Sequence, residues 1–153
     1  MQRDAVIVEV GLNEATMPAA NPNVPITPAA CADDALRCRD AGASVIHWHA
    51  RDPITGEQRL DDAVLYGEAL DPMRAGGLLA YPSYPVDCPD TIDARLAHVW
   101  RLREFQGLEL APVDIGSVTI VLWDSASRSL FGVEGLRERG VVSNTLPFTI
   151  DAL

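Results

Sequence analysis

The sequence feature that most constrains the fold is a short apolar run that ends in two histidines. Residues 43–52 read ASVIHWHARD, and the part before the charged Arg51 and Asp52 has the composition of a buried β-strand. Side chains alternate between the two faces of a strand, so His47 and His49 are expected on one face, about 6–7 Å apart along it. Two imidazoles at this spacing can converge on one metal ion.

The position of this pair at a strand end points to a functional role. In α/β folds with parallel strands, binding and catalytic groups gather beyond the carboxyl ends of the strands. The alternative is a pair of hydrogen-bonded histidines without a metal. Burying two imidazoles costs free energy unless both are satisfied, and a shared cation would satisfy both. Zinc takes nitrogen ligands and keeps one position open in catalytic sites, although imidazole also suits other late transition metals.

The chain before and after the pair alternates between strand and helix patterns. Ala5–Val10 is apolar and β-branched, and Glu14 follows its end, where the alternative role is a solvated loop carboxylate. A helix is expected to begin at Thr27 and Pro28 and to stop near Gly42. The later elements expected are a helix capped by Asp61 or Asp62, a strand at Leu78–Tyr81, a helix from Asp90 or Thr91, and a strand at Leu108–Val113.

The second half of the chain contains one more amphipathic helix, followed by extended segments. The helix after residue 90 has an apolar face at helical spacing, namely Ile92, Leu96, Val99, Trp100 and Phe105. His98 on this helix is expected to be a surface or helix-packing residue rather than a ligand. Beyond it we expect extended segments at Val118–Trp123 and Val141–Thr145, a helical turn at Glu134–Arg139 and a helix from Pro147.

Strand–helix units about 35 residues long favour a parallel sheet with right-handed crossovers. Four such units are half of an eight-fold barrel, which typically needs roughly 250 residues. We therefore predict an α/β fold of the parallel (β/α)₈ TIM-barrel type, of which residues 1–153 form a single domain with only about the first four units. On this prediction the chain is truncated relative to its natural fold.

Charge and cysteine usage narrow the class of protein. The formal net charge is −10, which argues against nucleic acid or an anionic membrane surface as a partner. The three cysteines form no CxxC pair and fit a reducing compartment. No apolar stretch has the length of a signal sequence core or a membrane span. We expect a cytoplasmic protein.

Longer motifs resemble a known family. Residues 21–28 (NPNVPITP) and 40–53 (DAGASVIHWHARDP) are similar to the β-keto acid cleavage enzymes, the family that includes 3-keto-5-aminohexanoate cleavage enzyme. The similarity continues through residues 113–118 and 142–145. It covers essentially the whole chain, but only the amino-terminal half of the family's barrel.

The resemblance implies a zinc-dependent (β/α)₈ enzyme that condenses a β-keto acid with acetyl-CoA and releases acetoacetate and a new acyl-CoA. By the same likeness, His47 and His49 would bind Zn²⁺. Glu14 would contact the variable end of the substrate, and Ser83 its carboxylate. Acetyl-CoA would be the co-substrate, and the protein would form a homo-oligomer.

The sequence also departs from the family pattern. Ser83-Tyr84-Pro85 stands where many members have Thr-Gly-Gly, and Pro112 falls where the aminohexanoate enzyme has a substrate-contacting threonine, so the keto acid stays open. The family's third zinc ligand, a glutamate, and the residues that move the proton lie in the carboxyl half. No catalytic residue is therefore assigned, and a general base is expected there. Glu9 and Asp114 are candidate substitutes for this base, but we expect both to have structural roles.

The histidine pair and the length of the chain also allow two other interpretations of its function. The HxH pair also occurs in amidohydrolase-type metallohydrolases, but there it usually lies on the first strand with further histidines downstream. The other interpretation is an inactive half-barrel that binds a metal weakly or needs a partner. Its open edge of parallel strands would favour self-association.

Overall fold

The structure, a computed structural model, describes residues 5–85 and 91–112 and the backbone of four short strands between residues 118 and 144. Two compact units are distinguished. One comprises Met1–Pro85 and Asp93–Pro112, and the other comprises Val86–Ile92 and Val113–Leu153. The single domain expected from the sequence stays a prediction.

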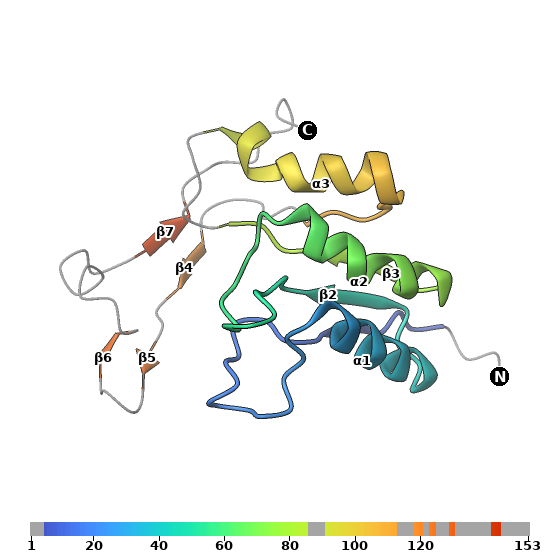
Figure 1. Cartoon of the computed structure of the whole chain (residues 1–153), viewed down its shortest axis with the longest axis horizontal. Coiled ribbons are helices and arrows are strands. Elements are labelled where there is room, and N and C mark those ends of the chain that lie inside the picture. Colours follow the sequence, from blue (N-terminus) through green and yellow to red (C-terminus); the bar gives the residue numbers. More distant parts are fainter. Residues whose placement is uncertain are drawn as a thin grey trace. The chain divides into compact units, whose positions relative to one another are not determined.

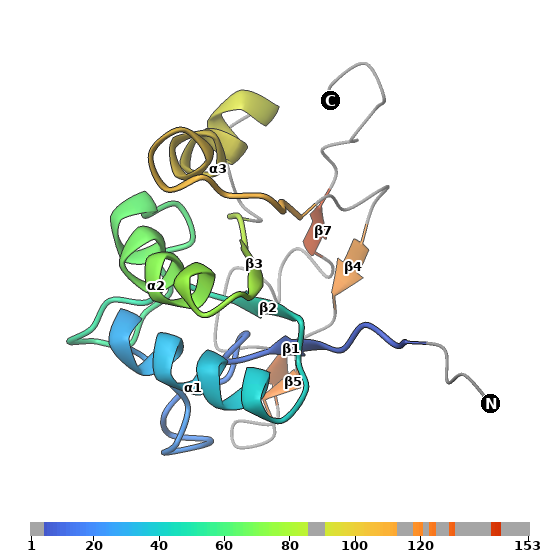
Figure 2. The ribbon, with the colours of Figure 1, turned by 90° about the vertical axis from the view of Figure 1, so that its right-hand side faces the viewer.

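The first unit is built on a parallel three-stranded sheet. Its strands are β1 (Glu9–Gly11), β2 (Val45–Trp48) and β3 (Leu79–Pro82), in the order β1-β2-β3. The helices α1 (Pro28–Asp40), α2 (Ala63–Ala75) and α3 (Ile92–Gln106) follow the three strands in turn (Figure 1). Figure 2 shows all three helices on the same side of the sheet. The α/β class and the parallel pairing predicted from the sequence are confirmed.

Local sequence signals explain where the helices begin and end. The Thr27 hydroxyl accepts a hydrogen bond from the Ala30 amide at 3.1 Å, and Pro28 occupies the first turn of α1. Gly42, just after α1, has φ 109°, a conformation that glycine adopts without a steric penalty. Asp62 caps α2 by accepting from two amides of its first turn. These boundaries agree with the sequence expectations.

The side chains of β2 alternate between the face of the sheet that packs on the helices and the opposite face. Ile46 and Trp48 are fully buried, and the Trp48 ring packs edge-on against Tyr66 of α2, with 5.3 Å between ring centroids. This face therefore meets the helices. His47 points to the opposite face, together with its register partner Tyr81 on β3. The histidines thus lie on the side of the sheet that the three helices do not cover.

Two strand predictions need correction in their boundaries. The first strand is limited to Glu9–Gly11, and Val6 and Ile7, expected inside it, are exposed. The third strand runs from Leu79 to Pro82, one residue later than predicted. In both cases the strand follows the register that β2 imposes rather than the apolar run.

The buried face of α3 also differs from the prediction. Leu96 and Val99 are buried as expected, but Trp100 and Phe105 are exposed. Their places in the core are taken by three residues at helical spacing, Arg95, His98 and Leu102. His98 is therefore a helix-packing residue and not a surface residue.

The predicted fourth strand is wrong over Leu108–Pro112, which the structure shows as irregular, and Val113 lies outside the described residues. In the second unit, β4 (Val118–Ile120) pairs antiparallel with β7 (Val142–Asn144), and β5 (Trp123–Asp124) pairs antiparallel with β6 (Ser129–Leu130). Extended backbone was expected at both β4 and β7. The expected turn at Glu134–Arg139 and the expected helix from Pro147 lie outside the described residues.

Within the part of the chain that the structure describes, no helix has the length and apolarity that crossing a bilayer requires.

Candidate metal and substrate site

Three side chains converge at the carboxyl ends of β1 and β2. One potential ligand atom from each of Glu14, His47 and His49 lies within 4.8 Å of the others. The Glu14 Oε2 atom is 3.3 Å from His49 Nε2 and 3.7 Å from His47 Nε2. The two imidazole rings have centroids 5.2 Å apart at an interplanar angle of 80°. The strand spacing predicted this convergence of the histidines, and the loop after β1 adds the carboxylate.

Glu14 reaches the histidines through an unusual backbone conformation. Its φ is 39°, in the left-handed region that non-glycine residues seldom adopt. Gly11 makes room for its carboxylate, because a Cβ at position 11 would run into Glu14 Oε1. Gly11 is also the register partner of His47, so the missing side chain lies directly beside the site. Glu14 itself is half-exposed, while both histidines are largely buried.

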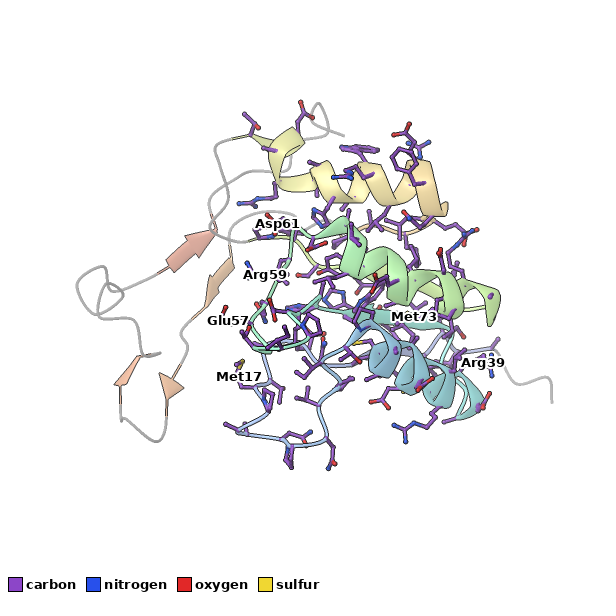
Figure 3. The ribbon with its side chains drawn as sticks, viewed as in Figure 1. Met17, Arg39, Glu57, Arg59, Asp61 and Met73 are labelled. Carbon is purple, nitrogen blue, oxygen red and sulfur yellow. The ribbon has the colours of Figure 1, made fainter. Side chains whose placement is uncertain are left out.

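Arg51 links the loops around the site from a fully buried position. Its Nη2 atom donates to the carbonyl oxygens of Glu14 at 2.7 Å and Thr16 at 2.9 Å, and Nη1 donates to the Gly56 carbonyl at 2.8 Å. The Nη1 atom also lies 3.4 Å from the Met17 sulfur. Figure 3 shows Met17 and the loop residue Glu57 at the same end of the unit, while Arg39 lies at the other end. A planar guanidinium suits this multiple donation.

Asn13 fixes the backbone of His49. Its Oδ1 atom accepts from the His49 amide at 2.8 Å, and its Nδ2 atom donates to the His49 carbonyl at 2.9 Å and to the Pro25 carbonyl at 3.1 Å. The Asn13 side chain is buried, its bond to Pro25 is buried with it, and the two bonds to the His49 backbone are part-buried. The loop after β1 therefore positions both Glu14 and His49.

The two histidine rings have different second partners. His47 Nδ1 lies 3.2 Å from the Tyr81 carbonyl oxygen, and the His47 ring stacks on the Tyr81 ring at 4.6 Å. His49 Nδ1 lies 3.0 Å from the Gln58 amide nitrogen. Burial, followed by the nearby His47 and Arg51, lowers the pKa of His49 from 6.5 to about 4. His49 is therefore a neutral imidazole at neutral pH, the form that binds metals.

Ser83, the second predicted substrate residue, follows β3 and is held by other groups. Its amide donates to the Tyr66 hydroxyl at 3.2 Å, and its carbonyl accepts from His98 Nε2 at 2.7 Å. The described hydrogen bonds of Ser83 therefore run to α2 and α3 rather than to Glu14 and the histidines. Its contact with a substrate stays a prediction.

The remaining candidates lie apart from the three converging side chains. The Glu9 carboxylate accepts a hydrogen bond from the Tyr81 hydroxyl, in keeping with a structural role. Pro112 is in the irregular segment after α3, and Asp114 lies outside the described residues. An open hollow of about 500 Å³ near Arg74 and Glu109 borders the amino end of β3, whereas the histidines lie near the carboxyl end of β2.

The donor set fits a divalent metal such as zinc. Two ligands on a tetrahedral zinc, at bond lengths of roughly 2.0–2.1 Å, lie about 3.4 Å apart. The carboxylate-to-imidazole separations of 3.3 and 3.7 Å are close to this spacing. Imidazole nitrogens and a carboxylate oxygen are also the ligand types that zinc accepts. The arrangement can hold a cation, and the Glu14 side chain beside it is half-exposed.

Sequence reasoning missed Asn13, Arg51 and Gln58 as parts of this site. Arg51 carried a signal, because a charged residue directly after a buried apolar strand needs partners close by. Nothing in the sequence pattern marked Asn13 or Gln58, since their contacts join loops that are 36 and 44 residues apart.

Comparison with known proteins agrees with the earlier resemblance. A family model described as beta-keto acid cleavage enzyme matches residues 5–152. The chain is 34% identical over 125 residues to 3-dehydrocarnitine:acetyl-CoA trimethylamine transferase of Rhizobium meliloti (strain 1021), covering 67% of this chain and 39% of the relative. It is 45% identical over 47 residues to 3,5-dioxohexanoate:acetyl-CoA acetone transferase of Paraburkholderia graminis (strain ATCC 700544 / DSM 17151 / LMG 18924 / NCIMB 13744 / C4D1M), covering 31% of this chain and 15% of the relative. The matches thus span well under half the length of these curated relatives. The chain belongs to the beta-keto acid cleavage enzyme family.

Proposed function

We propose that this chain is the metal-binding part of an acetyl-CoA-dependent β-keto acid cleavage enzyme. In the proposed reaction, a small β-keto acid and acetyl-CoA give acetoacetate and a new acyl-CoA. Both curated relatives are named as transferases that use acetyl-CoA, and their other substrates differ from each other. We therefore propose the reaction class and leave the individual keto acid unassigned.

The observation that supports the proposal most directly is the convergence of Glu14, His47 and His49 at the strand ends. His47 and His49 would hold a divalent metal, with Zn²⁺ as our first choice. When bound, zinc would supply Lewis-acid stabilisation of an enolate. The depressed pKa of His49 keeps its imidazole neutral, as metal binding requires.

Glu14 and Ser83 are proposed to bind the substrate, Glu14 at its variable end and Ser83 at its carboxylate. Glu14 is the most exposed of the three converging side chains, as a group that meets an incoming molecule must be. Its carboxylate also lies close enough to complete the metal's ligand set, so the two roles need separate tests. We assign no general base among the described residues and expect it in the carboxyl half of the barrel.

The proposed complete fold is a (β/α)₈ barrel. In the first unit the strand order follows the chain order and all three helices cover one face of the sheet. A barrel winds in this single direction, whereas a doubly wound sheet reverses direction and carries helices on both faces. The uncovered face, with His47 and Tyr81, would then line the barrel interior.

The proposal is tested by zinc content and turnover in three variants. His47→Ala and His49→Ala, measured by elemental analysis after dialysis, should each lose most of the bound zinc. His98→Gln changes a histidine away from the site and should retain it. Turnover of β-keto acids with acetyl-CoA, measured on the protein as a complete barrel, should fall with the zinc. Equal zinc in the double variant His47→Ala/His49→Ala and in the unaltered chain would overturn the assignment.

A further inference from the structure

The Gln58 side chain bridges two parts of the site through one nitrogen atom. Its Nε2 lies 3.0 Å from the Glu14 carbonyl oxygen and 3.0 Å from His49 Nδ1. A carbonyl oxygen is only an acceptor, so the amide atom facing it must be the nitrogen and not Oε1. The Glu14 backbone therefore decides which way the Gln58 amide points.

This orientation determines the tautomer of His49. An amide NH₂ group only donates, so His49 Nδ1 must be the acceptor and carry no proton. In the neutral ring the proton is then on Nε2, the atom that lies 3.3 Å from the Glu14 carboxylate. The proton of His49 Nε2 therefore occupies the position of the lone pair that a metal at this site would need.

His47 has the opposite arrangement. Its Nδ1 atom faces the Tyr81 carbonyl oxygen at 3.2 Å, which can only accept, so the proton is on Nδ1. With the ring proton on Nδ1, the neutral form of His47 has its lone pair on Nε2, which faces the site 3.7 Å from Glu14 Oε2. One histidine is preset as a metal ligand, while the other holds its proton on the atom that would have to bind.

We propose that Gln58 is a positioning residue that sets the tautomer of His49 and must turn its amide when a metal binds. This inference rests on the proposed metal site. A metal-bound histidine donates the N–H of its other ring nitrogen to an acceptor. For His49 that nitrogen is Nδ1, and Gln58 can offer an acceptor only by turning its Oε1 towards it. The turn would give up its bond to the Glu14 carbonyl, which keeps its bond from Arg51. Metal binding at His49 would in this way be coupled to the loop that carries Glu14.

The first experiment detects the ring protons directly. In the metal-free chain labelled with ¹⁵N-histidine, NMR should show His49 protonated on Nε2 and His47 on Nδ1. The Gln58→Glu variant replaces the donor with an acceptor, so a proton should appear on His49 Nδ1. A metal-free wild-type chain with the His49 proton on Nδ1 would overturn the inference, whatever the metal affinity is.

The second experiment measures zinc affinity by competition with a chromophoric chelator. Gln58→Glu should lower the zinc dissociation constant about tenfold, the lower end of the effects seen for partners of metal-bound histidines. Ile54→Glu is the matched control, because it adds the same charge to an exposed position of the same loop. It should change the constant less than twofold. Equal effects of the two variants would show that the added charge alone causes the change, and would reject the role of Gln58.

The two experiments distinguish a failure of this inference from a failure of the proposed function. If the unaltered chain bound no zinc, the proposed metal site would fail, and the proton positions would still decide the role of Gln58. If zinc bound at the two histidines but Gln58→Glu left both tautomer and affinity unchanged, only the present inference would fail.

Discussion

Arg51 donates a 2.7 Å hydrogen bond to the carbonyl oxygen of Glu14, a residue whose φ is 39°. The left-handed conformation costs a non-glycine residue roughly 1–2 kcal/mol and persists only where surrounding contacts enforce it. Arg51 and Gln58 both donate to this carbonyl, so the buried guanidinium and the loop after β2 hold Glu14 in the conformation that directs its carboxylate to the histidines.

The strain at position 14 can be measured with two substitutions that both remove the carboxylate. Glycine adopts a positive φ without a steric penalty, while alanine does not. Glu14→Gly should therefore be more stable than Glu14→Ala by about 1 kcal/mol in denaturant unfolding. If the alanine variant were as stable as the glycine variant, the left-handed conformation would not be the one that the protein adopts in solution.

Gly11→Ala should weaken metal binding with little effect on stability. The added methyl group occupies the place of the Glu14 carboxylate, the flexible end of a half-exposed side chain that can move aside. Zinc titration should show weaker binding, and the unfolding free energy should change by less than about 0.5 kcal/mol.

Gly42→Ala is the matched control for Gly11→Ala and should give the reverse result. A Cβ at Gly42 meets no atom within 4 Å, but its φ of 109° disfavours alanine. This variant should lose about 1 kcal/mol of stability and keep its zinc affinity. Unchanged zinc binding in Gly11→Ala would show that the carboxylate does not contribute as a ligand.

Asn13→Ala should lower the free energy of unfolding far more than the same substitution at an exposed asparagine. It removes three hydrogen bonds to backbone groups and a longer one to the Cys31 sulfur. The His49 amide and carbonyl and the Pro25 carbonyl then lose a buried or part-buried partner. Each buried group left unsatisfied costs about 1–3 kcal/mol, so we expect a total loss of roughly 3 kcal/mol. Asn23→Ala, at an exposed position, should stay within about 0.5 kcal/mol. Equal stability of the two variants would contradict the role assigned to Asn13.

Stability should fall as the pH is lowered below about 6.5. Burial lowers the pKa of His98 below its usual 6.5, against the opposing effects of the Ser83 carbonyl bond and of Asp61. The unfolded chain then takes up protons at a pH where the folded chain does not, so the loss begins near pH 6.5 and continues downward, by at most about 1.4 kcal/mol per pH unit for each histidine. His49 contributes with the same sign between 6.5 and about 4.

The measurement for this pH dependence is the free energy of unfolding of the metal-free chain at several pH values. His98→Gln keeps a side-chain donor for the Ser83 carbonyl and removes one of the titrating groups. Its stability should therefore decline less steeply below pH 6.5 than that of the unaltered chain. Identical slopes would show that His98 is not a source of the dependence.

Much of the local structure could be predicted from the sequence, because its signals are short-range. The alternation of a strand placed His47 and His49 on one face, and capping residues such as Thr27 set where helices begin. The failures have a common cause. Leu108–Pro112 has the composition of a strand without the pairing that makes one, and Phe105 has the helical spacing of the core without being covered. Pairing and coverage depend on neighbours that are distant in the sequence.

By itself, the sequence determined the strand–helix alternation, the parallel sheet, the histidine pair and the family. Only the tertiary structure decided how that pair is surrounded. Glu14 approaches the histidines because Gly11 has no side chain and because Arg51 holds the Glu14 carbonyl. The second partners of the two rings are the Tyr81 carbonyl and the Gln58 amide. The hydrogen bonds from Glu14, His47 and His49 to these partners join residues 9 to 37 positions apart, so their geometry is set when the sheet forms and not by any local propensity.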